Sequence, residues 1–384
     1  MKNKIFAIIV SLIIFAIVGT GLYMLLRPES QYEDVNWETV EHTDAYDYHY
    51  YLELEVKEKI AYENIMAEYA TFPEKIEIPE LTEAELTKVY TAVLYDNPLL
   101  FCFDKNCNII SIGGSFYFEP QYTMQKNEYE SKLAEIRALT PEIVKNLPSG
   151  SGEFEVELYL HDYIIDKCVY TDTNSFVETT LYGALVEGKA SCEGYSRAMK
   201  YLSDFCNIDC YVLFGTAETE NEKNNHMWNI ITIDGDKYHI DVTWNDTIAK
   251  DDTIPDHRYM YFNLTDEEIK NTHYNFETDD KCTSNKANYY VYNNLNFESF
   301  GAEDKRQLAT AIAAAADSGK ASLGVRFENK ELYEKAVNAL IEDQEIFYVL
   351  KEADNKTDKI IETKKFYYRK VENVKILEIM FSVV

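Results

Sequence analysis

Gly188-Lys189-Ala190-Ser191-Cys192-Glu193-Gly194-Tyr195 is the stretch that decides the fold at the centre of this 384-residue chain. Ser191 belongs to the residue types that favour the N-cap position of a helix. Apolar side chains then recur at helical spacing, at Tyr195, Ala198, Met199, Leu202 and Phe205. The pattern predicts a buried helix over 192–206, with the thiol of Cys192 in its first turn.

A cysteine in the first turn of a helix has a chemical consequence. The unpaired backbone N–H groups and the dipole of a helix N-terminus favour a thiolate over a thiol. The same N–H groups can donate to an oxyanion on an attacked carbonyl. A lone cysteine after a serine is also consistent with a structural role, so the interpretation depends on residues elsewhere in the chain.

Two further segments form a predicted hairpin. His226-Met227-Trp228-Asn229 opens an apolar strand, Asp234-Gly235 is a strong two-residue turn signal, and Asp241-Val242-Thr243-Trp244 lies on the returning strand. With a two-residue turn, Asp241 lies diagonally from His226 on the same face, where a carboxylate can orient the imidazole and stabilise its charged form. A three-residue loop would move Asp241 to the opposite face, so the prediction depends on register.

The motifs C-x-G-Y at Cys192, H-x-W-N at His226 and D-x-T-W at Asp241, in this order, resemble the bacterial transglutaminase-like superfamily. The resemblance covers about residues 150–265. In that part of the chain, His161-Asp162-Tyr163 and Tyr170-Thr171-Asp172 resemble the helix that precedes the nucleophile.

The resemblance implies an α+β fold with a papain-like core, in which helices pack on an antiparallel sheet. It also implies that Cys192 attacks an amide carbonyl, that His226 transfers protons and that Asp241 orients His226. The acyl group then passes to an amine, which gives cross-linking, or to water, which gives hydrolysis. Some members of the superfamily use calcium, but no calcium-loop spacing is present, and no cofactor or metal is predicted.

Three aromatic residues are weaker candidates for substrate contacts. Trp228 and Trp244 can roof the cleft or help to hold the oxyanion, and Tyr195 can line the substrate groove. Large aromatic side chains on half-buried strands are more often part of the core. Asn229 is predicted to point away from the face of His226, and His239 is interpreted as a satisfied surface histidine.

The cysteines allow more than one interpretation. They are Cys102, Cys107, Cys168, Cys192, Cys206, Cys210 and Cys282. An odd number leaves at least one thiol free or paired between chains, which fits one working thiol and up to three disulfides, or several small buried hydrophobic residues. A zinc site that uses Cys206, Cys210, His226 or His239 is a further alternative, but the chain has no second paired-ligand motif.

The first 27 residues are predicted to form a cytoplasmic tip and a transmembrane anchor. The uncharged run from Ile5 to Leu26 is long enough, at about 1.5 Å rise per residue, to cross roughly 30 Å of hydrocarbon. Lys2 and Lys4 precede the run, so we expect a cytoplasmic N-terminus and an extracytoplasmic C-terminal bulk at the cell membrane. A cleaved signal peptide, which would make the protein secreted, is the alternative.

Charge excludes one class of partner. The formal net charge is −30 at pH 7, from 37 Lys and Arg against 67 Asp and Glu. A nucleic-acid partner needs clustered basic residues, and the sequence has none, so no nucleic acid is predicted as a partner. The hydrophobic fraction of 46% is ordinary for packed globular domains.

Composition and periodicity predict three regions after an acidic linker over 28–49. They are a mostly helical region over 50–148, a catalytic domain over 153–280, and a small α/β domain of unknown role over 285–384. The first region has predicted helices at 52–69, 82–97 and 126–139, with alternating residues from 109 to 118. The catalytic domain has predicted helices at 153–167, 178–186 and 192–206, then strands at 210–216, 226–233 and 237–244. The last region has predicted strands at 289–295, 322–327, 345–351 and 365–383, and helices at 303–317 and 330–342.

The leading functional hypothesis is extracytoplasmic, thiol-dependent acyl transfer or hydrolysis at amide bonds, through a thioester at Cys192. The expected substrate is a protein or a cell-wall peptide, and hydrolysis ranks slightly above cross-linking. The alternative hypothesis is a membrane-tethered binding or scaffold protein whose core is catalytically silent. The intact Cys, His and Asp set argues against that alternative.

Overall fold

The computed structural model describes residues 30–32, 35–40, 42–147, 149–218, 223–246 and 258–383. The chain divides into two compact units, one that ends at Tyr129 and one that begins at Glu130. The domain bounds predicted from the sequence stay predictions. The predicted anchor over 5–26 lies outside the described residues, and within the residues described no helix is both long and apolar enough to span a membrane.

The first unit combines short helices with a three-stranded antiparallel sheet. Its helices are α2 (His49–Leu52), α3 (Val56–Glu68) and α4 (Glu83–Asp96), and its strands are β1 (Ile76–Ile78), β2 (Phe103–Ile112) and β3 (Ser115–Tyr122), in the order β1-β3-β2. A capping box begins α4, because Thr82 accepts from the Glu85 N–H and Glu85 accepts from the Thr82 N–H. Helix α5 (Lys126–Val144) is longer than its prediction.

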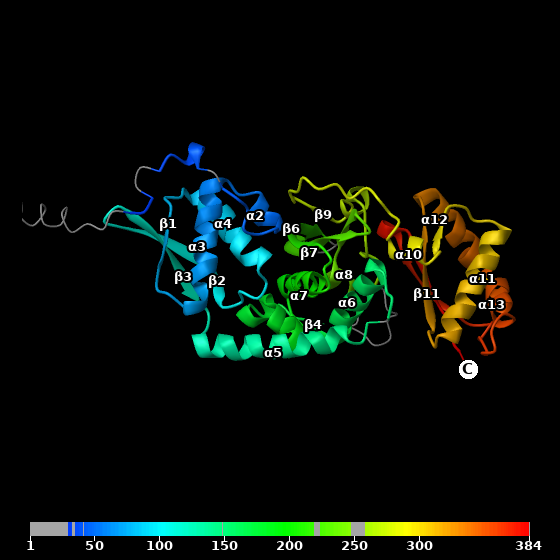
Figure 1. Cartoon of the computed structure of the whole chain (residues 1–384). Coiled ribbons are helices and arrows are strands. Elements are labelled where there is room, and N and C mark those ends of the chain that lie inside the picture. Colours follow the sequence, from blue (N-terminus) through cyan, green and yellow to red (C-terminus); the bar gives the residue numbers. More distant parts are fainter. Residues whose placement is uncertain are drawn as a thin grey trace, which may run out of the picture. The chain divides into compact units, whose positions relative to one another are not determined.

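A four-stranded antiparallel sheet forms the part of the second unit that carries the three motifs. The strands are β6 (Cys210–Glu218), β7 (Lys223–Ile233), β8 (Asp236–Ile240) and β9 (His273–Tyr274), in the order β8-β7-β6-β9. The helices are α6 (Glu153–Lys167), α7 (Cys192–Phe205), α8 (Val242–Asn245) and α9 (Asp266–Ile269). Helix α7 packs against β6 and β7 (Figure 1), and the α+β fold predicted from the sequence is confirmed.

Two predicted elements in this region differ from the structure. The predicted helix over 178–186 is replaced by a 3₁₀ turn, Phe176–Thr179, and a π-helical turn, Gly183–Glu187. Between the helices, β4 (Val169–Tyr170) and β5 (Lys189–Ala190) pair in parallel. A Cβ on Gly183 would lie 2.3 Å from the Val177 carbonyl oxygen, so only glycine permits this tight return of the chain.

The hairpin between β7 and β8 has the predicted two-residue turn. Asp234 and Gly235 have φ values of 50° and 83°, and the register runs from Ile233 opposite Asp236 to Asn229 opposite Ile240. The prediction that the strand continues to 244 is wrong. The Asp241 carboxylate accepts a hydrogen bond from the Trp244 N–H at 3.0 Å, which caps α8 and ends the strand.

The C-terminal part of the second unit is a small α/β fold. A mixed sheet has the order β10-β11-β13-β12, from β10 (Asn296–Phe297), β11 (Ser322–Phe327), β12 (Tyr367–Val371) and β13 (Ile376–Met380). The helices are α10 (Tyr289–Tyr292), α11 (Ala302–Asp317), α12 (Lys330–Val337) and α13 (Ile346–Asp354), with a π-helical turn at Asn338–Glu342 and a 3₁₀ turn at Glu372–Val374.

Three predictions in this part need correction. The predicted strand over 345–351 is helix α13, whose buried residues Ile346, Val349, Leu350 and Ala353 recur at helical spacing. The predicted strand over 289–295 is largely helix α10, because the Asn288 side chain caps it by accepting from the Tyr290 N–H. The segment 365–383 contains two strands rather than one.

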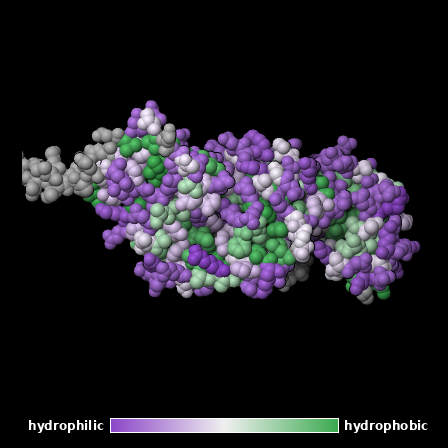
Figure 2. Space-filling view, in the orientation of Figure 1, coloured by the Kyte–Doolittle hydropathy of each residue, from purple (hydrophilic) through white to green (hydrophobic). Residues whose placement is uncertain are grey.

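One hydrophobic core joins the C-terminal part to the segment 258–274, which lies after β8 and ends with β9. Met260, Tyr261, Leu264 and Ile269 belong to the same buried cluster as the apolar residues of α11 and α13. Hydrophilic side chains cover most of the face drawn in Figure 2, in keeping with the charged composition. The shared core means that residues near the C-terminus can influence the position of the 258–274 segment.

Candidate active site

Helix α7 places Cys192 at its first residue, as the sequence predicts, and the thiol is partly exposed. Ser191 is the N-cap residue, but its hydroxyl donates to the Glu178 carbonyl at 3.3 Å and makes no capping bond. The first N–H groups of the helix therefore have no side-chain cap from Ser191. A helix end in this state can donate to an oxyanion.

Gly194 explains the glycine of the C-x-G-Y motif. A Cβ at this position would lie 2.5 Å from the Glu178 carbonyl oxygen and 2.7 Å from the Cβ of Ala190. Real Cβ atoms essentially never approach other atoms so closely, so a larger residue would push α7 away from the loop that precedes it. Glycine thereby fixes the position of the thiol two residues earlier.

The structure brings Cys192, His226 and Asp241 together. His226 lies on β7 opposite Gly215 of β6, and its Nε2 lies 2.7 Å from Oδ2 of Asp241. The Cys192 side chain forms a hydrogen bond with His226. Because Nε2 is engaged by Asp241, Nδ1 is the ring nitrogen that remains for the thiol. The imidazole thus lies between a carboxylate and a thiol, which is the arrangement of a nucleophile, a base and an orienting group.

Burial and charge set the protonation of this pair. Burial alone lowers the pKa of His226, but the charge of Asp241 and hydrogen bonds to Asp241 and Cys192 raise the pKa to about 10. Burial alone raises the pKa of Asp241, but the charge and hydrogen bond of His226, with a hydrogen bond from His273, hold it below its ordinary value. At neutral pH the site contains an imidazolium paired with a carboxylate.

Asp241 is held from both sides of its carboxylate. Oδ1 accepts the Trp244 N–H, and α8 is held in turn by Asn245, which accepts the Tyr261 N–H at 2.7 Å. The Asn245 amide also lies 3.1 Å from Nε2 of His161. His161, from the His161-Asp162-Tyr163 motif, therefore helps to hold the Asp241 carboxylate in place through Asn245 and α8.

His273 is a site residue that the sequence prediction missed. It lies on β9, is fully buried, and places Nε2 at 3.0 Å from Oδ2 of Asp241. The short two-residue strand after an acidic helix start offered no recognisable motif. Only the pairing of β9 with β6, at Ala217 opposite His273, brings it to the site.

The three aromatic residues predicted to contact substrate differ in exposure. Trp228 is fully buried and its indole N–H donates to Nδ1 of His239 at 3.1 Å, so it packs behind the imidazole and offers no surface to a substrate. Tyr195 is also fully buried, and its hydroxyl donates to Asp246. Trp244 is partly exposed, with its ring 5.6 Å from that of His226, and so is placed to cover the imidazole.

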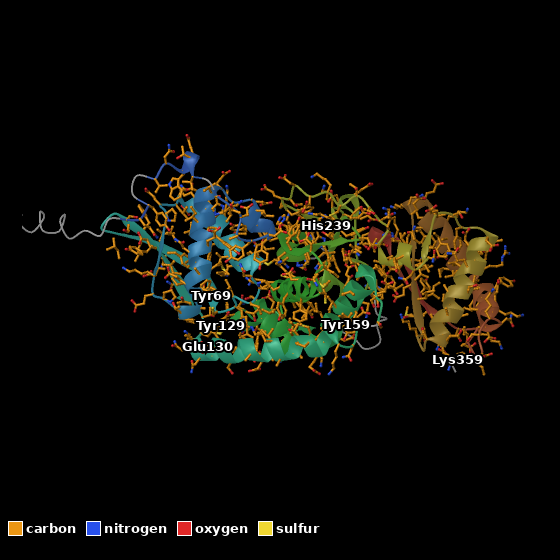
Figure 3. The ribbon with its side chains drawn as sticks, viewed as in Figure 1. Tyr69, Tyr129, Glu130, Tyr159, His239 and Lys359 are labelled. Atoms are coloured by element: carbon orange, nitrogen blue, oxygen red, sulfur yellow. The ribbon has the colours of Figure 1, made fainter. Side chains whose placement is uncertain are left out.

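The interpretation of His239 as a surface residue is wrong. His239, labelled in Figure 3, lies on β8 and is fully buried, with Nε2 at 3.0 Å from Oδ1 of Asp266. Burial lowers the pKa of His239 to about 4, although Asp266 acts in the opposite direction. The Asn229 amide donates to the Ser196 carbonyl of α7 and to the Tyr211 carbonyl of β6, in line with the prediction of a structural role.

None of the seven cysteines forms a disulfide. In the described part of the chain, the groups whose geometry could hold a metal ion are His226 with Asp241 and His273, and His239 with Asp266 and Cys282. Neither group contains Cys206 or Cys210, on which the zinc alternative depends. In the first group both histidines hydrogen-bond to Asp241, and in the second His239 hydrogen-bonds to Asp266, which accounts for the proximity of these atoms.

Comparison with known proteins supports the fold of the centre of the chain. A family model described as "Transglutaminase-like superfamily" matches residues 137–242, so this stretch is a transglutaminase-like domain. A search of curated proteins gave no match. This matched stretch contains Cys192, His226 and Asp241.

Solved structures give only distant similarity. A structure described as "Crystal structure of a TGase" is 14% identical, with a TM-score of 0.25, over 48% of this chain and 54% of that one. A structure described as "a Putative Cysteine Protease from Cytophaga hutchinsonii" is 12% identical, with a TM-score of 0.25, over 36% of this chain and 61% of that one. The chain thus spans between about half and three fifths of these matched chains.

Proposed function

We propose that this protein is a thiol-dependent enzyme that acts on amide bonds, with Cys192 as the nucleophile. His226 transfers the proton and Asp241 orients His226. The observation that carries the proposal is the line of contacts from the Cys192 thiol through His226 to the buried Asp241 carboxylate, 2.7 Å from the ring. The transglutaminase-like match over the same residues supports it independently.

The geometry supports a two-stage reaction. The Cys192 thiolate attacks the amide carbon, and the carbonyl oxygen takes the electron pair as an oxyanion beside the N-terminus of α7. The C–N bond then breaks, His226 gives its proton to the leaving amine, and a thioester remains. Water or a primary amine attacks the thioester, loses its proton to His226, and releases the acyl group from Cys192. The thiolate and imidazolium are then restored.

Alkylation by iodoacetamide tests the nucleophile without knowledge of the substrate. We expect Cys192 in the wild-type protein to react faster at neutral pH than the other cysteines. The His226→Ala variant should lose this advantage, and the Cys192→Ser variant should lose the labelled site while it keeps its fold. Equal reactivity of Cys192 in the wild type and in His226→Ala would overturn the proposal.

The acyl acceptor requires a separate assay. A Gln-containing peptide is incubated with a labelled primary amine, and the products are separated by mass spectrometry. Release of ammonia without label incorporation supports hydrolysis, which we propose as the principal reaction, whereas label in the peptide supports transfer. A scaffold function would be favoured if the Cys192→Ser variant kept full cellular function.

The location and substrate class are also proposals. The uncharged run over 5–26, with Lys2 and Lys4 before it, supports an anchor with the catalytic part outside the membrane. An amide in an extracellular protein or a cell-wall peptide is the matching substrate. Protease treatment of intact cells tests the placement, since the catalytic domain should be cleaved only if it is exposed outside. Recovery of a truncated chain in the medium would favour signal cleavage instead.

A further inference from the structure

We propose that His273 is a positioning residue of this active site, a neutral hydrogen-bond donor that keeps the Asp241 carboxylate ionised and oriented toward His226. The inference rests on the proposed function and extends it by a fourth residue. It is drawn from a contact that none of the three motifs contains. His273 approaches Asp241 from β9, whereas His226 approaches it from β7.

The buried Asp241 carboxylate needs several hydrogen-bond donors to stay ionised. Asp241 has no exposed surface. Its Oδ2 accepts from Nε2 of His226 at 2.7 Å and from Nε2 of His273 at 3.0 Å, while Oδ1 accepts a backbone N–H. A buried carboxylate remains ionised when it accepts two or three such bonds, so removal of one donor weakens the charged form.

The tautomer of His273 depends on the partner of its other ring nitrogen. Nδ1 of His273 lies 2.9 Å from the hydroxyl of Thr272, whose other partners are the Ile269 carbonyl at 3.4 Å and the Tyr261 hydroxyl. If the hydroxyl donates to Nδ1, the neutral ring carries its proton on Nε2, the atom that faces Asp241. The neighbour Thr272 thus selects the tautomer that can donate to the carboxylate.

The surroundings of His273 favour its neutral form. The charged or titratable groups that face His273 are Asp241, His226 and, through its ring, Tyr261. Trp228 and Trp244 supply uncharged walls, with ring centroids at 4.8 Å and 4.6 Å. Burial lowers the pKa of His273, and the charge of His226 lowers it further, although Asp241 acts in the opposite direction. The Asp241 carboxylate therefore accepts hydrogen bonds from a charged histidine, His226, and from a neutral one, His273.

A metal ion is the competing explanation, because His226, Asp241 and His273 could also hold a cation. A cation would have to replace the protons in both imidazole–carboxylate hydrogen bonds. The distances of 2.7 Å and 3.0 Å are those of hydrogen bonds between heavy atoms and already account for the cluster. Metal content therefore belongs among the outcomes of the test.

The direct test is the protonation of His273 in the full-length protein. Two-bond ¹H–¹⁵N correlation spectra of protein labelled on histidine distinguish the charged ring from each neutral tautomer. We expect His273 to remain neutral, with the proton on Nε2, from about pH 5 to about pH 8, the range in which an ordinary histidine titrates. A titration of His273 in that range, an Nδ1–H tautomer, or a stoichiometric metal in the purified protein would each overturn the proposal.

The functional test compares the alkylation rate of Cys192 across pH in three variants. His273→Phe removes the donor, and we expect the alkylation rate to be about tenfold lower. The acid limb, which is the fall of the rate at low pH, should move to higher pH because Asp241 is protonated more easily. His273→Gln restores an N–H at the position of Nε2 and should recover most of the rate. His239→Gln removes an equally buried histidine that does not contact Asp241, and its acid limb should match the wild type.

The two tests separate this inference from the proposed function. If Cys192 has no enhanced reactivity in the wild-type protein, the proposed function fails, while the spectra still report the tautomer of His273. If Cys192 is reactive and all three variants share the wild-type acid limb, the role of His273 fails alone. Melting curves of His273→Phe and His239→Gln show whether a loss of rate comes from unfolding, and His273→Gln keeps the proposal falsifiable if His273→Phe does not fold.

Discussion

Two buried histidines on neighbouring strands, His226 of β7 and His239 of β8, each contact a carboxylate but differ in charge. His226 and Asp241 are 2.7 Å apart, and the pKa of His226 is raised to about 10. His239 and Asp266 are 3.0 Å apart, and the pKa of His239 is lowered to about 4. The residue types are the same and the distances are nearly so. Proximity to a carboxylate therefore does not decide whether a buried histidine is charged.

The second ring nitrogens of the two histidines have different partners. Nδ1 of His239 accepts the indole N–H of Trp228 at 3.1 Å, which requires a lone pair and hence a neutral ring. The ring of His226 meets a thiol at its other side. A thiolate there would favour the imidazolium. The partner on the second ring nitrogen thus distinguishes the histidine that can exchange a proton with a thiol from the one that accepts a fixed N–H.

The largest expected effect comes from the removal of each carboxylate in turn. Asp241→Asn preserves the shape of the side chain but removes the charge that supports the His226 imidazolium. We expect the alkylation rate of Cys192, and any turnover, to fall by about 10²–10⁴-fold, the range associated with loss of an orienting acid or a general base. Asp266→Asn should change the rate by less than about threefold, since His239 is already neutral. Similar losses in the two variants would contradict the comparison.

The dependence of stability on pH should have opposite signs for the two histidines. The folded pKa of His226, about 10, exceeds the unfolded value near 6.5, so its contribution is complete below about pH 6.5 and is lost as the pH rises toward 10. The folded pKa of His239, about 4, is below that value, so its contribution is complete above about pH 6.5 and is lost as the pH falls toward 4.

Urea unfolding of the wild type, His226→Gln and His239→Gln measures these contributions. We expect His226→Gln to reduce the loss of unfolding free energy on the alkaline side, and His239→Gln to reduce the loss on the acid side. Each variant acts as the control for the other, because both remove one buried ring from the same sheet. If both variants reduce the loss of unfolding free energy on the same side of the pH range, the charges assigned to His226 and His239 are wrong.

A smaller effect is expected from Trp228→Phe, which retains an aromatic ring and removes the indole N–H. Nδ1 of His239 then loses its donor, at a cost of about 1–3 kcal/mol of unfolding free energy for an unsatisfied buried group. The pKa of His239 should rise from about 4, because the ring is free to accept a second proton beside Asp266. Histidine titration by NMR and urea unfolding measure the two changes. An unchanged titration of His239 would show that Trp228 does not hold it neutral.

The sequence predicted the parts of the site that depend on local pattern. The N-cap at Ser191 and the periodic apolar residues placed Cys192 at a helix start, and the Asp234-Gly235 turn fixed the register of the hairpin. The prediction was wrong at Asp241, where the side chain caps a helix and the strand does not continue. The Asp241 carboxylate caps α8, so the chain turns and the contact with His226 is not that of two neighbouring strands.

The remaining site residues depend on contacts between segments that are far apart in the sequence. His273 reaches Asp241 only because β9 pairs with β6, and a two-residue strand has no detectable period. The burial of His239 depends on Asp266 and on the indole of Trp228, which lie on different elements. In α13, a short apolar run is equally compatible with a strand or a helix, and packing in the C-terminal core decides between them.

The smallest effect should come from a change at Tyr261, which connects the C-terminal part to His273. The Tyr261 hydroxyl hydrogen-bonds to Thr272 and to Asn373, and Thr272 in turn contacts Nδ1 of His273. Tyr261→Phe retains the ring that packs edge-on against Trp244 at 5.1 Å, and removes only the hydroxyl. We expect the alkylation rate of Cys192 to fall by less than about threefold, because Thr272 can still donate to His273.

Asn373→Ala is the matched variant on the C-terminal side of the same hydroxyl. It should have an effect no larger than that of Tyr261→Phe, and histidine NMR should show the Nε2–H tautomer of His273 still predominant in both variants. A tenfold loss in either variant, with an unchanged melting curve, would mean that the C-terminal part controls His273 more directly than these contacts imply. Because four hydrogen bonds separate the Tyr261 hydroxyl from His226, only a small loss of rate is expected.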